Sequence, residues 1–415
     1  MTTPSEKRSD SLWFFEPAKI RELANGYLER AIAGELRHVS VNLENLPQAL
    51  IRVLETTKST YPDFQIPPYG VWRDFEVGGV DRWGAIANAR AFESAEEMLT
   101  ASADLAILTA LMNTTRPINW SYTEPNTGAE AEGKSASALA AFNMFSAGFF
   151  SADLSDPFRV DAETLIRIPA EELATGLQWD QLRNDDLVQK MQRLLKRFGE
   201  ALALRSDLFG EGQTTRPGLL ARHLAETGNG TVDANAVLDQ LLEALVPVWD
   251  GGAVLEEITL GDSFTHSAAA NALEIMPFHL CAQEMVYSLV EPFAWAGCEV
   301  ANLDALSGPS DLIHAVLFAE TNVLGFGTDF EIADAAVTQD RMVEIRAVTI
   351  ALTDRLSDML RKELNVASDQ LPMTCILEGG TSRAGGQILR ENGAQVQNLG
   401  KFMNPGSVFW LPFGA

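Results

Sequence analysis

The sequence has few basic residues for its length, and this excludes partners that need a cationic surface. Its 415 residues include 31 lysines and arginines against 57 aspartates and glutamates, which gives a formal net charge of −26. Nucleic acids and anionic membranes are bound through clustered positive charge, so we expect neither as a partner. Excess acidic charge is typical of a soluble protein.

Cysteine, leader segments and ligand-binding motifs are also scarce. The three cysteines, Cys281, Cys298 and Cys375, lack metal-ligand spacing and predict buried, reduced thiols, hence a cytoplasmic protein. The polar amino terminus does not resemble a signal peptide, and no apolar run is long enough to span a membrane. The five histidines show no i, i+4 pair, and neither a Walker loop nor a dinucleotide fingerprint is present. We therefore expect neither a metal nor a cofactor.

What the sequence does contain is an apolar fraction of 46%, enough for a large core. Helical periodicity recurs along the chain, and short strand patterns interrupt it, one of them at Leu371–Leu377. The prediction is a mainly α fold with a few short strands. We expect residues 1–14 to be disordered and residues 15–415 to form a single helical domain; a division into two lobes, 15–215 and 216–415, stays open.

The segment Pro277–Gly297 predicts a central helix with one apolar and one polar face. The polar arc contains His279, Gln283 and Tyr287, whose side chains form hydrogen bonds in fixed directions. Two interpretations remain open for these residues. They form one wall of a ligand site, or they satisfy buried backbone groups.

One acidic residue stands out among several that lie in turns. Asp311 follows the rigid turn Gly308-Pro309-Ser310 and precedes an apolar run. An acid at the mouth of an apolar segment can act on a substrate. The same position suits a helix N-cap, so the pattern alone leaves both roles open.

Several segments together resemble the uracil catabolism protein 4 family, over about residues 15 to 390. They are Trp72–Trp83, Met144–Asp153, Asp156–Asp161, Pro277–His279 with Gln283, Tyr287–Pro292, Trp295–Gly297 and Leu377–Thr381. A weaker similarity, at Phe278–Gln283, Asp311 and Val343–Ala347, is to queuosine nucleotide N-glycosylases, which implies a DNA-glycosylase-like helical body. In those enzymes the acid matching Asp311 acts at the ribose C1′. Both families usually have Lys where this chain has Leu280, and Tyr-Arg where it has Leu312-Ile313, so a phosphate clamp at these positions is absent.

The resemblance implies a hydrolase of uracil catabolism, a pyrimidine degradation pathway, that cleaves the N-glycosidic bond of a nucleoside-like or ribosylurea-like small molecule. Asp311 is the expected catalytic residue. The expected substrate-binding residues are His279, Gln283, Tyr287, Glu344, Arg346, Asp81 and Arg82. We expect Glu344 and Arg346 to form a buried pair, and Asp81 and Arg82 to hold the Gly78-Gly79 corner. Two alternatives remain open: another enzyme acting on a ureido or pyrimidine-derived compound, and a non-catalytic binding protein on the same fold. Self-association to a homo-oligomer is compatible with the sequence.

Overall fold

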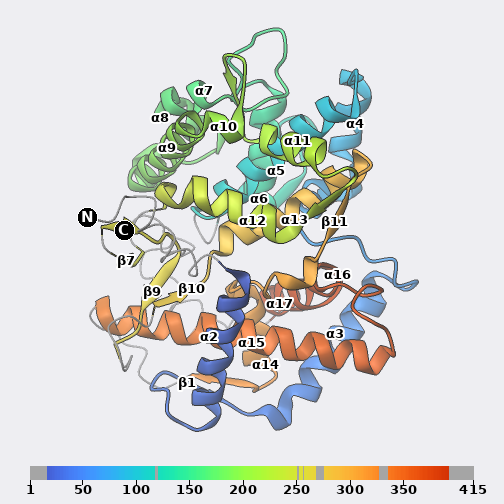
Figure 1. The fold of residues 1–415 in the computed structure, drawn as a ribbon, viewed down its shortest axis with the longest axis vertical. Helices are drawn as coiled ribbons and strands as arrows, with labels where there is room; N and C mark the ends of the chain where they lie inside the picture. Colours follow the sequence, from blue (N-terminus) through green and yellow to red (C-terminus); the bar gives the residue numbers. More distant parts are fainter. Residues whose placement is uncertain are drawn as a thin grey trace. The chain divides into compact units, whose positions relative to one another are not determined.

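The computed structural model describes residues 16–116, 120–249, 252–255, 257–267, 275–326 and 335–391. The chain divides into two compact units, each built from separate stretches (Figure 1). Among the described residues, unit 1 takes those within 16–69, 252–283 and 302–391, and unit 2 takes those within 70–249 and 284–301. The boundary considered between residues 215 and 216 therefore falls inside unit 2. The expected disordered segment 1–14 lies outside the described residues.

Helices dominate both units, which confirms the mainly α prediction. Those of unit 1 are α2 (Pro17–Ile32), η2 (Leu43–Asn45), α3 (Leu46–Thr60), η5 (Leu303–Ala305), α14 (Leu312–Glu320), α15 (Ala335–Leu364), α16 (Met373–Ile376), the π-helical turn η6 (Leu377–Thr381) and α17 (Ser382–Glu391). Helix α2 packs along α15 (Figure 1), where Arg21 Nε donates to Asp354 at 2.8 Å. Apolar side chains from both helices are fully buried, so this contact forms part of the unit 1 core.

Unit 2 is built around the buried helix α5 (Ala95–Met112). Its apolar residues surround the helix instead of lining one face, which is typical of a helix enclosed by others. The remaining helices are η3 (Val71–Gly79), α4 (Arg82–Arg90), α6 (Gly133–Ser146), α7 (Ala162–Arg167), α8 (Ala170–Gly176), α9 (Gln181–Leu204), α10 (Ser206–Phe209), α11 (Gly218–Thr227), α12 (Ala234–Leu245) and η4 (Val246–Val248). Helices α6 and α11 pack directly on α5. Helix α13 (Leu280–Trp295) begins in unit 1 and continues into unit 2.

The strands that the structure describes form two-stranded pairs. In unit 1, β1 (Val39–Val41) pairs with β12 (Leu324–Phe326), β7 (Val254–Leu255) with β8 (Ile258–Thr259), and β9 (Ser263–Thr265) with β10 (Ile275–Pro277), all antiparallel. In unit 2, β2 (Ser121–Thr123) pairs with β3 (Glu130–Glu132) and β4 (Gly210–Glu211) with β5 (Thr214–Thr215), also antiparallel, whereas β6 (Thr231–Asp233) and β11 (Glu299–Ala301) are parallel. In register, Ile275 faces Thr265 and Pro277 faces Ser263.

Two predicted elements differ from the structure. The predicted strand Leu371–Leu377 is wrong, because Pro372 opens the short helix α16, which runs into η6. A short buried apolar run has no periodicity that separates strand from helix, and proline is well suited to the start of a helix. The predicted helix Pro277–Gly297 begins later, at Leu280, since Pro277 belongs to β10. Its predicted end is confirmed: Gly297 has φ +79° just after the last turn.

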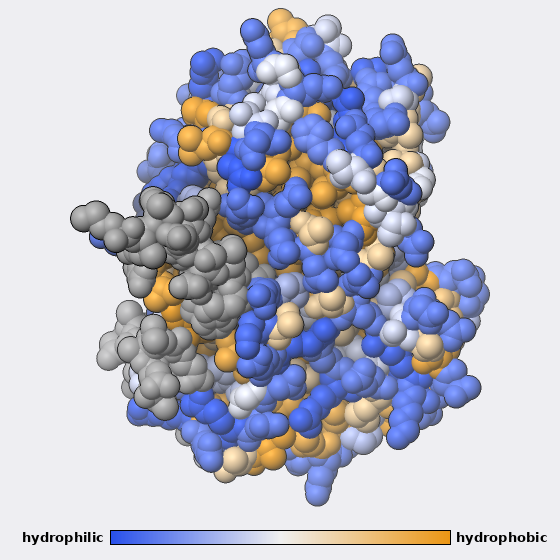
Figure 2. Space-filling view, viewed as in Figure 1, coloured by the Kyte–Doolittle hydropathy of each residue, from blue (hydrophilic) through white to orange (hydrophobic). Residues whose placement is uncertain are grey.

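Hydrophilic residues cover most of the face drawn in Figure 2, in keeping with the acid-rich composition. Within the described ranges, no helix combines the length and the hydropathy of a membrane span. None of the three cysteines, all of which lie in the described ranges, forms a disulfide bond. Cys281 is buried as expected, whereas Cys298 and Cys375 are partly exposed.

Candidate active site

The start of helix α13 is fixed by a carboxylate that precedes it by eighteen residues. Asp262, in the turn before β9, accepts a hydrogen bond from the Leu280 backbone N–H through Oδ2 at 3.0 Å. Its carbonyl oxygen accepts from the N–H groups of Phe278 and His279 at 2.8 and 3.2 Å. The first N–H groups of a helix lack intrahelical partners, so Asp262 supplies acceptors that the helix itself lacks.

Arg346 on helix α15 joins this carboxylate to the Asp311 turn. Its Nη1 and Nη2 donate to the two oxygens of Asp262 at 2.7 and 2.6 Å, and its Nη2 and Nε donate to Ser310 Oγ at 2.9 and 3.2 Å. The guanidinium carbon lies 4.0 Å from the centroid of the Phe278 ring, a cation–π contact. Both ion-pair partners are buried. Two-point pairing fixes the orientation of the guanidinium as well as its position.

Asp311 follows Ser310 directly and is the N-cap of helix α14. Its Oδ1 accepts from the Ile313 backbone N–H at 3.2 Å, and its side chain is buried. The N-cap interpretation is therefore confirmed. The chemical role of Asp311 stays a prediction, and a cap does not exclude it.

Glu344, two residues before Arg346, makes a separate set of contacts. Its Oε1 lies 3.0 Å from His266 Nε2, and its Oε2 accepts from the backbone N–H groups of His38 and Val39 at 2.8 and 3.1 Å. Burial lowers the pKa of the His38 imidazole below its usual value. The expected Glu344–Arg346 pair is wrong, because each side chain has other partners; residues two apart on a helix point in different directions.

Gln283 and His279 lie at the start of α13 within unit 1. The Gln283 amide donates to the Phe278 carbonyl at 2.9 Å and accepts from Ser307 Oγ at 3.0 Å, so it satisfies a buried backbone group. His279 is buried and has φ +46°, in the left-handed region that side chains other than glycine rarely adopt. The printed hydrogen bonds link the backbone N–H of His279 to Asp262, Asp262 to Arg346, and Arg346 to Ser310, which directly precedes Asp311. Gln283 contributes two hydrogen bonds with a structural role, one to the Phe278 carbonyl and one from Ser307.

The remaining predicted site residues belong to unit 2. Tyr287 is buried in helix α13, and Asp81 caps helix α4 by accepting from the Gly84 backbone N–H at 2.8 Å. Arg82 donates to both oxygens of Glu124 at 2.8 and 2.7 Å and to the carbonyls of Phe75 and Val77. Arg82 therefore holds the Gly78-Gly79 corner, as expected. The assignment of Tyr287, Asp81 and Arg82 to a substrate site stays a prediction.

Three polar residues of the hydrogen-bond network around Arg346 and Gln283 were absent from the predicted site. Asp262 carries its central ion pair, and Ser307 and Ser310 accept or donate the hydrogen bonds that tie the turn to α13 and α15. The position of Asp262 directly after Gly261, in a turn before a short strand, was the available signal for Asp262. Its arginine partner is 84 residues away, and no local pattern identifies such a pairing.

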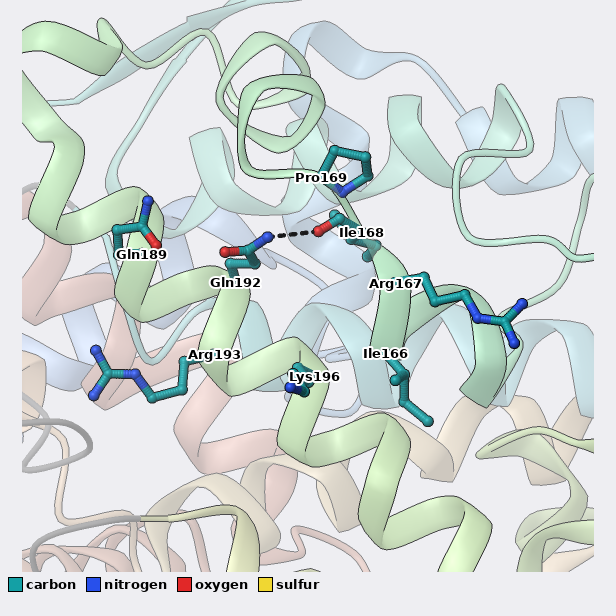
Figure 3. A pocket seen from close by; sticks show the side chains of 8 residues that line it. All are labelled: Ile166, Arg167, Ile168, Pro169, Gln189, Gln192, Arg193 and Lys196. Atoms are coloured by element: carbon teal, nitrogen blue, oxygen red, sulfur yellow. Dashed lines mark hydrogen bonds between the residues drawn. The ribbon is translucent and has the colours of Figure 1, made fainter.

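A separate hollow of about 500 Å³ lies in unit 2, between helices α7 and α9. Figure 3 shows its lining, which is Ile166, Arg167, Ile168, Pro169, Gln189, Gln192, Arg193 and Lys196. Gln192 donates to the Ile168 carbonyl at 2.7 Å across it. This lining has no carboxylate, so it does not suit the acid chemistry expected at Asp311. Among the described residues, no group of three His, Cys, Asp or Glu side chains is arranged to hold a metal ion.

Comparison with known proteins matches residues 14–398 to a family described as "Protein of unknown function (DUF1688)". The chain belongs to the DUF1688 family. It is 27% identical over 385 residues to "Protein urg3" of Schizosaccharomyces pombe, covering 90% of this chain and 92% of that protein. It is 26% identical over 358 residues to "Uracil catabolism protein 4" of Lachancea kluyveri, covering 78% and 80%. This DUF1688 chain is thus a divergent relative of both proteins, and the expected resemblance to the uracil catabolism family is confirmed.

Proposed function

We propose that this DUF1688 protein acts in pyrimidine catabolism as a hydrolase of an N-glycosidic bond. The observation that carries the proposal is the Asp311 carboxylate, which is buried, fixed by the Ile313 N–H and adjacent to the serine that Arg346 binds. The name of the Lachancea kluyveri relative, uracil catabolism protein 4, supports the choice of pathway. The substrate class is a nucleoside-like or ribosylurea-like compound.

The reaction requires stabilisation of positive charge at one carbon. Departure of the leaving nitrogen from C1′ gives an oxocarbenium-like state, and a fixed anion close to C1′ lowers its energy. Water then adds its hydroxyl group to C1′, and a proton ends on the departing nitrogen. Asp311 supplies the anion, accepts the proton that water loses and passes it to the departing nitrogen, so that the carboxylate is regenerated. The Asp262–Arg346 pair binds Ser310 and so keeps the turn Gly308-Pro309-Ser310, which precedes Asp311, in place. His279 is proposed to contact polar atoms of the leaving group.

Mass spectrometry of wild-type and Asp311→Asn protein, incubated with ribosylureas and nucleosides, tests this function. Asparagine caps helices about as well as aspartate, so the variant keeps the fold while it loses the anion and the base. We expect sugar release by the wild type and a loss of about 10²–10⁴-fold in the variant. Asp304→Asn is the matched control, because Asp304 is an acid of the same unit that pairs with Arg361.

Two other outcomes of this experiment would each indicate a different function. Release of ammonia or carbon dioxide with the sugar bond intact identifies an enzyme that acts on the ureido group. Stabilisation by one compound without any turnover, equal in wild type and Asp311→Asn, identifies a binding protein.

A further inference from the structure

The hollow between helices α7 and α9 has a lining that is rich in positive charge. Three of the eight described residues that line it are cationic, Arg167, Arg193 and Lys196, although the chain has 31 lysines and arginines against 57 acidic residues. Its volume of about 500 Å³ is in the range of small-molecule sites, which is about 300–1,000 Å³. The hollow belongs to unit 2, whereas Asp311 belongs to unit 1. The proposed function makes no use of this hollow.

Helix α9 presents a polar face to the hollow. Its lining residues lie at positions i, i+3, i+4 and i+7, on the same side of the helix: Gln189, Gln192, Arg193 and Lys196. Arg167 comes from the opposite wall, at the end of α7. In Figure 3 the Arg167 and Arg193 side chains lie on either side of the hydrogen bond that joins Gln192 to Ile168. Cations therefore border the hollow from both walls.

Two contacts hold these walls at a fixed separation. The Gln192 amide donates to the carbonyl of Ile168, the residue that follows α7, at 2.7 Å. Further along α9, a Cβ atom added to Gly199 would lie 2.6 Å from the Ala162 carbonyl oxygen and 2.9 Å from Ile166 Cγ1, so glycine permits the close approach of the two helices. A site whose walls are already in place has less ordering cost when it binds a ligand.

The charged groups of the hollow remain in contact with water. Arg167 and Arg193 are exposed, and the Lys196 side chain is 55% exposed. Lys196 Nζ lies 3.9 Å from Glu200 Oε1, one turn further along α9. An exposed pair of this kind contributes little to stability, so an anionic ligand can compete with the glutamate. We expect an affinity that falls as the salt concentration rises, because exposed charges are screened.

A smaller hollow beside the first has a different charge. It measures about 220 Å³ and shares Arg167, Ile168 and Pro169 with the larger one, but Glu163 and Glu172 also line it. An anion in the smaller hollow would meet these two carboxylates. The larger hollow is therefore the better place for an anion.

From these features we infer that the hollow between α7 and α9 binds an organic phosphate. A phosphate group carries about two negative charges at neutral pH, and guanidinium and ammonium groups donate strong hydrogen bonds to its oxygens. Inorganic phosphate would fill only part of the hollow, and Ile166, Ile168 and Pro169 offer an apolar wall to the organic part of a larger ligand. The inference uses no residue of the Asp311 site, so failure of the hydrolase proposal leaves it intact.

Isothermal titration calorimetry of the full chain at low salt tests this inference with uridine 5′-phosphate, uridine and inorganic phosphate. We expect uridine 5′-phosphate to bind at least about tenfold more tightly than the other two, because it alone joins the anion to a ring. Equal affinity for uridine overturns the role of the phosphate, and equal affinity for inorganic phosphate overturns the role of the organic part. Absence of binding at millimolar uridine 5′-phosphate overturns the whole inference.

Matched substitutions within unit 2 locate the binding. Arg193→Gln removes a cation from the lining, whereas Arg222→Gln removes one that pairs with Glu211 and Glu226. We expect Arg193→Gln to weaken the binding of uridine 5′-phosphate by about five- to tenfold, the effect of one hydrogen bond between charged groups. Arg222→Gln should bind as the wild type does. Equal weakening in both variants would indicate general attraction by charge and would overturn the site.

Gln189 allows a further test in which one position is changed in two directions. The residue is exposed and lies one turn before Arg193 in the lining, so both changes should leave the fold intact. Gln189→Glu adds a negative charge there and should weaken the binding of uridine 5′-phosphate, whereas Gln189→Lys adds a positive charge and should strengthen it. Effects of the same sign, or no effect from either change, contradict an anion in this hollow.

Discussion

The Asp311 carboxylate has a structural role that is visible in the fold and a chemical role that we propose. The two roles use different properties of the side chain. The cap needs an oxygen that accepts a hydrogen bond from Ile313, whereas the reaction needs a negative charge. Substitutions that remove one property at a time therefore separate them.

Asp311→Ala removes both properties, and Asp311→Asn removes the charge alone. Loss of an N-cap oxygen costs about 0.5–2 kcal/mol. We expect urea denaturation to show this decrease in the free energy of unfolding for the alanine variant and little change for asparagine. Sugar release should be lost in both. An asparagine variant as unstable as the alanine variant would show that the charge, not the oxygen, holds the turn.

The carboxyl group of Glu124 makes the free energy of unfolding depend on pH in the acid range. Hydrogen bonds from Arg82 hold the pKa of its carboxyl at about 2, below the ordinary 4.5. As the pH falls, the Glu124 carboxylate is therefore protonated in the unfolded chain before it is protonated in the folded protein. The contribution of Glu124 to the free energy of unfolding is complete above about pH 4.5 and is lost progressively towards pH 2. Urea denaturation across this range should show a weaker pH dependence for Glu124→Gln than for wild type.

Glu124→Gln also leaves the buried Arg82 without its counter-charge. We expect the free energy of unfolding at pH 7 to fall by about 3–5 kcal/mol, the usual cost of removing one partner of a buried pair. Glu226→Gln is the matched control, because it removes a carboxylate from an exposed pair, which is worth at most about 1 kcal/mol. Equal losses in both variants would contradict a buried role for the Arg82–Glu124 pair.

At the scale of elements, helix α17 approaches the first turn of α14 through a glycine. A Cβ atom added to Gly385 would lie 1.9 Å from the Ile313 carbonyl oxygen, whereas one on Gly386 would meet its nearest atoms at 3.6 and 3.8 Å. The Gly385-Gly386 pair lies inside this helix, where Gly385 permits close packing.

The two glycines form a matched pair of substitutions. Gly385→Ala should push α14 away and lower the free energy of unfolding by about 1–3 kcal/mol, because the clash is with backbone. Gly386→Ala should be neutral or stabilising by up to about 1 kcal/mol, since alanine favours the helix. Thermal or urea denaturation measures both. Equal effects from the two substitutions would contradict the close approach.

The sequence predicted the helices better than the partners of polar side chains. Recurring helical periodicity predicted the mainly α fold, because the buried residues of many helices repeat every three to four positions. It placed His279, Gln283 and Asp311 as polar residues worth attention. It did not predict that Arg346 would bind Asp262 instead of Glu344, because that choice is made by folding over 84 residues. The strand predicted at Leu371–Leu377 failed since its apolar run is too short to have a recognisable period.

At the scale of the whole molecule, each unit is assembled from distant parts of the chain. Helix α2, near the amino terminus, packs on α15, and helix α11 packs on α5. The buried Asp104 on α5 accepts from the Gly218 backbone N–H at 2.7 Å and from Arg216. A division between residues 215 and 216 would therefore separate partners within unit 2 and also within unit 1.

We expect the fragments 16–215 and 216–391 to lack cooperative folding when each is produced alone. Each would expose apolar surface that its missing partner covers, and Asp104 would lose its donors beyond residue 215. Circular dichroism during heating should show broad, weak transitions for each fragment and a steep one for the full chain. A sharp transition in either fragment would show that a lobe with that boundary folds by itself.

The cap at Asp311 also affects how such a protein can change over time. The donor to its carboxylate is the main-chain N–H of Ile313, which any amino acid except proline provides at that position. Mutation can therefore alter the side chain at 313 while the acid remains held in place. Relatives that share only 26–27% of their residues can retain one reactive group and diverge in the compounds they accept.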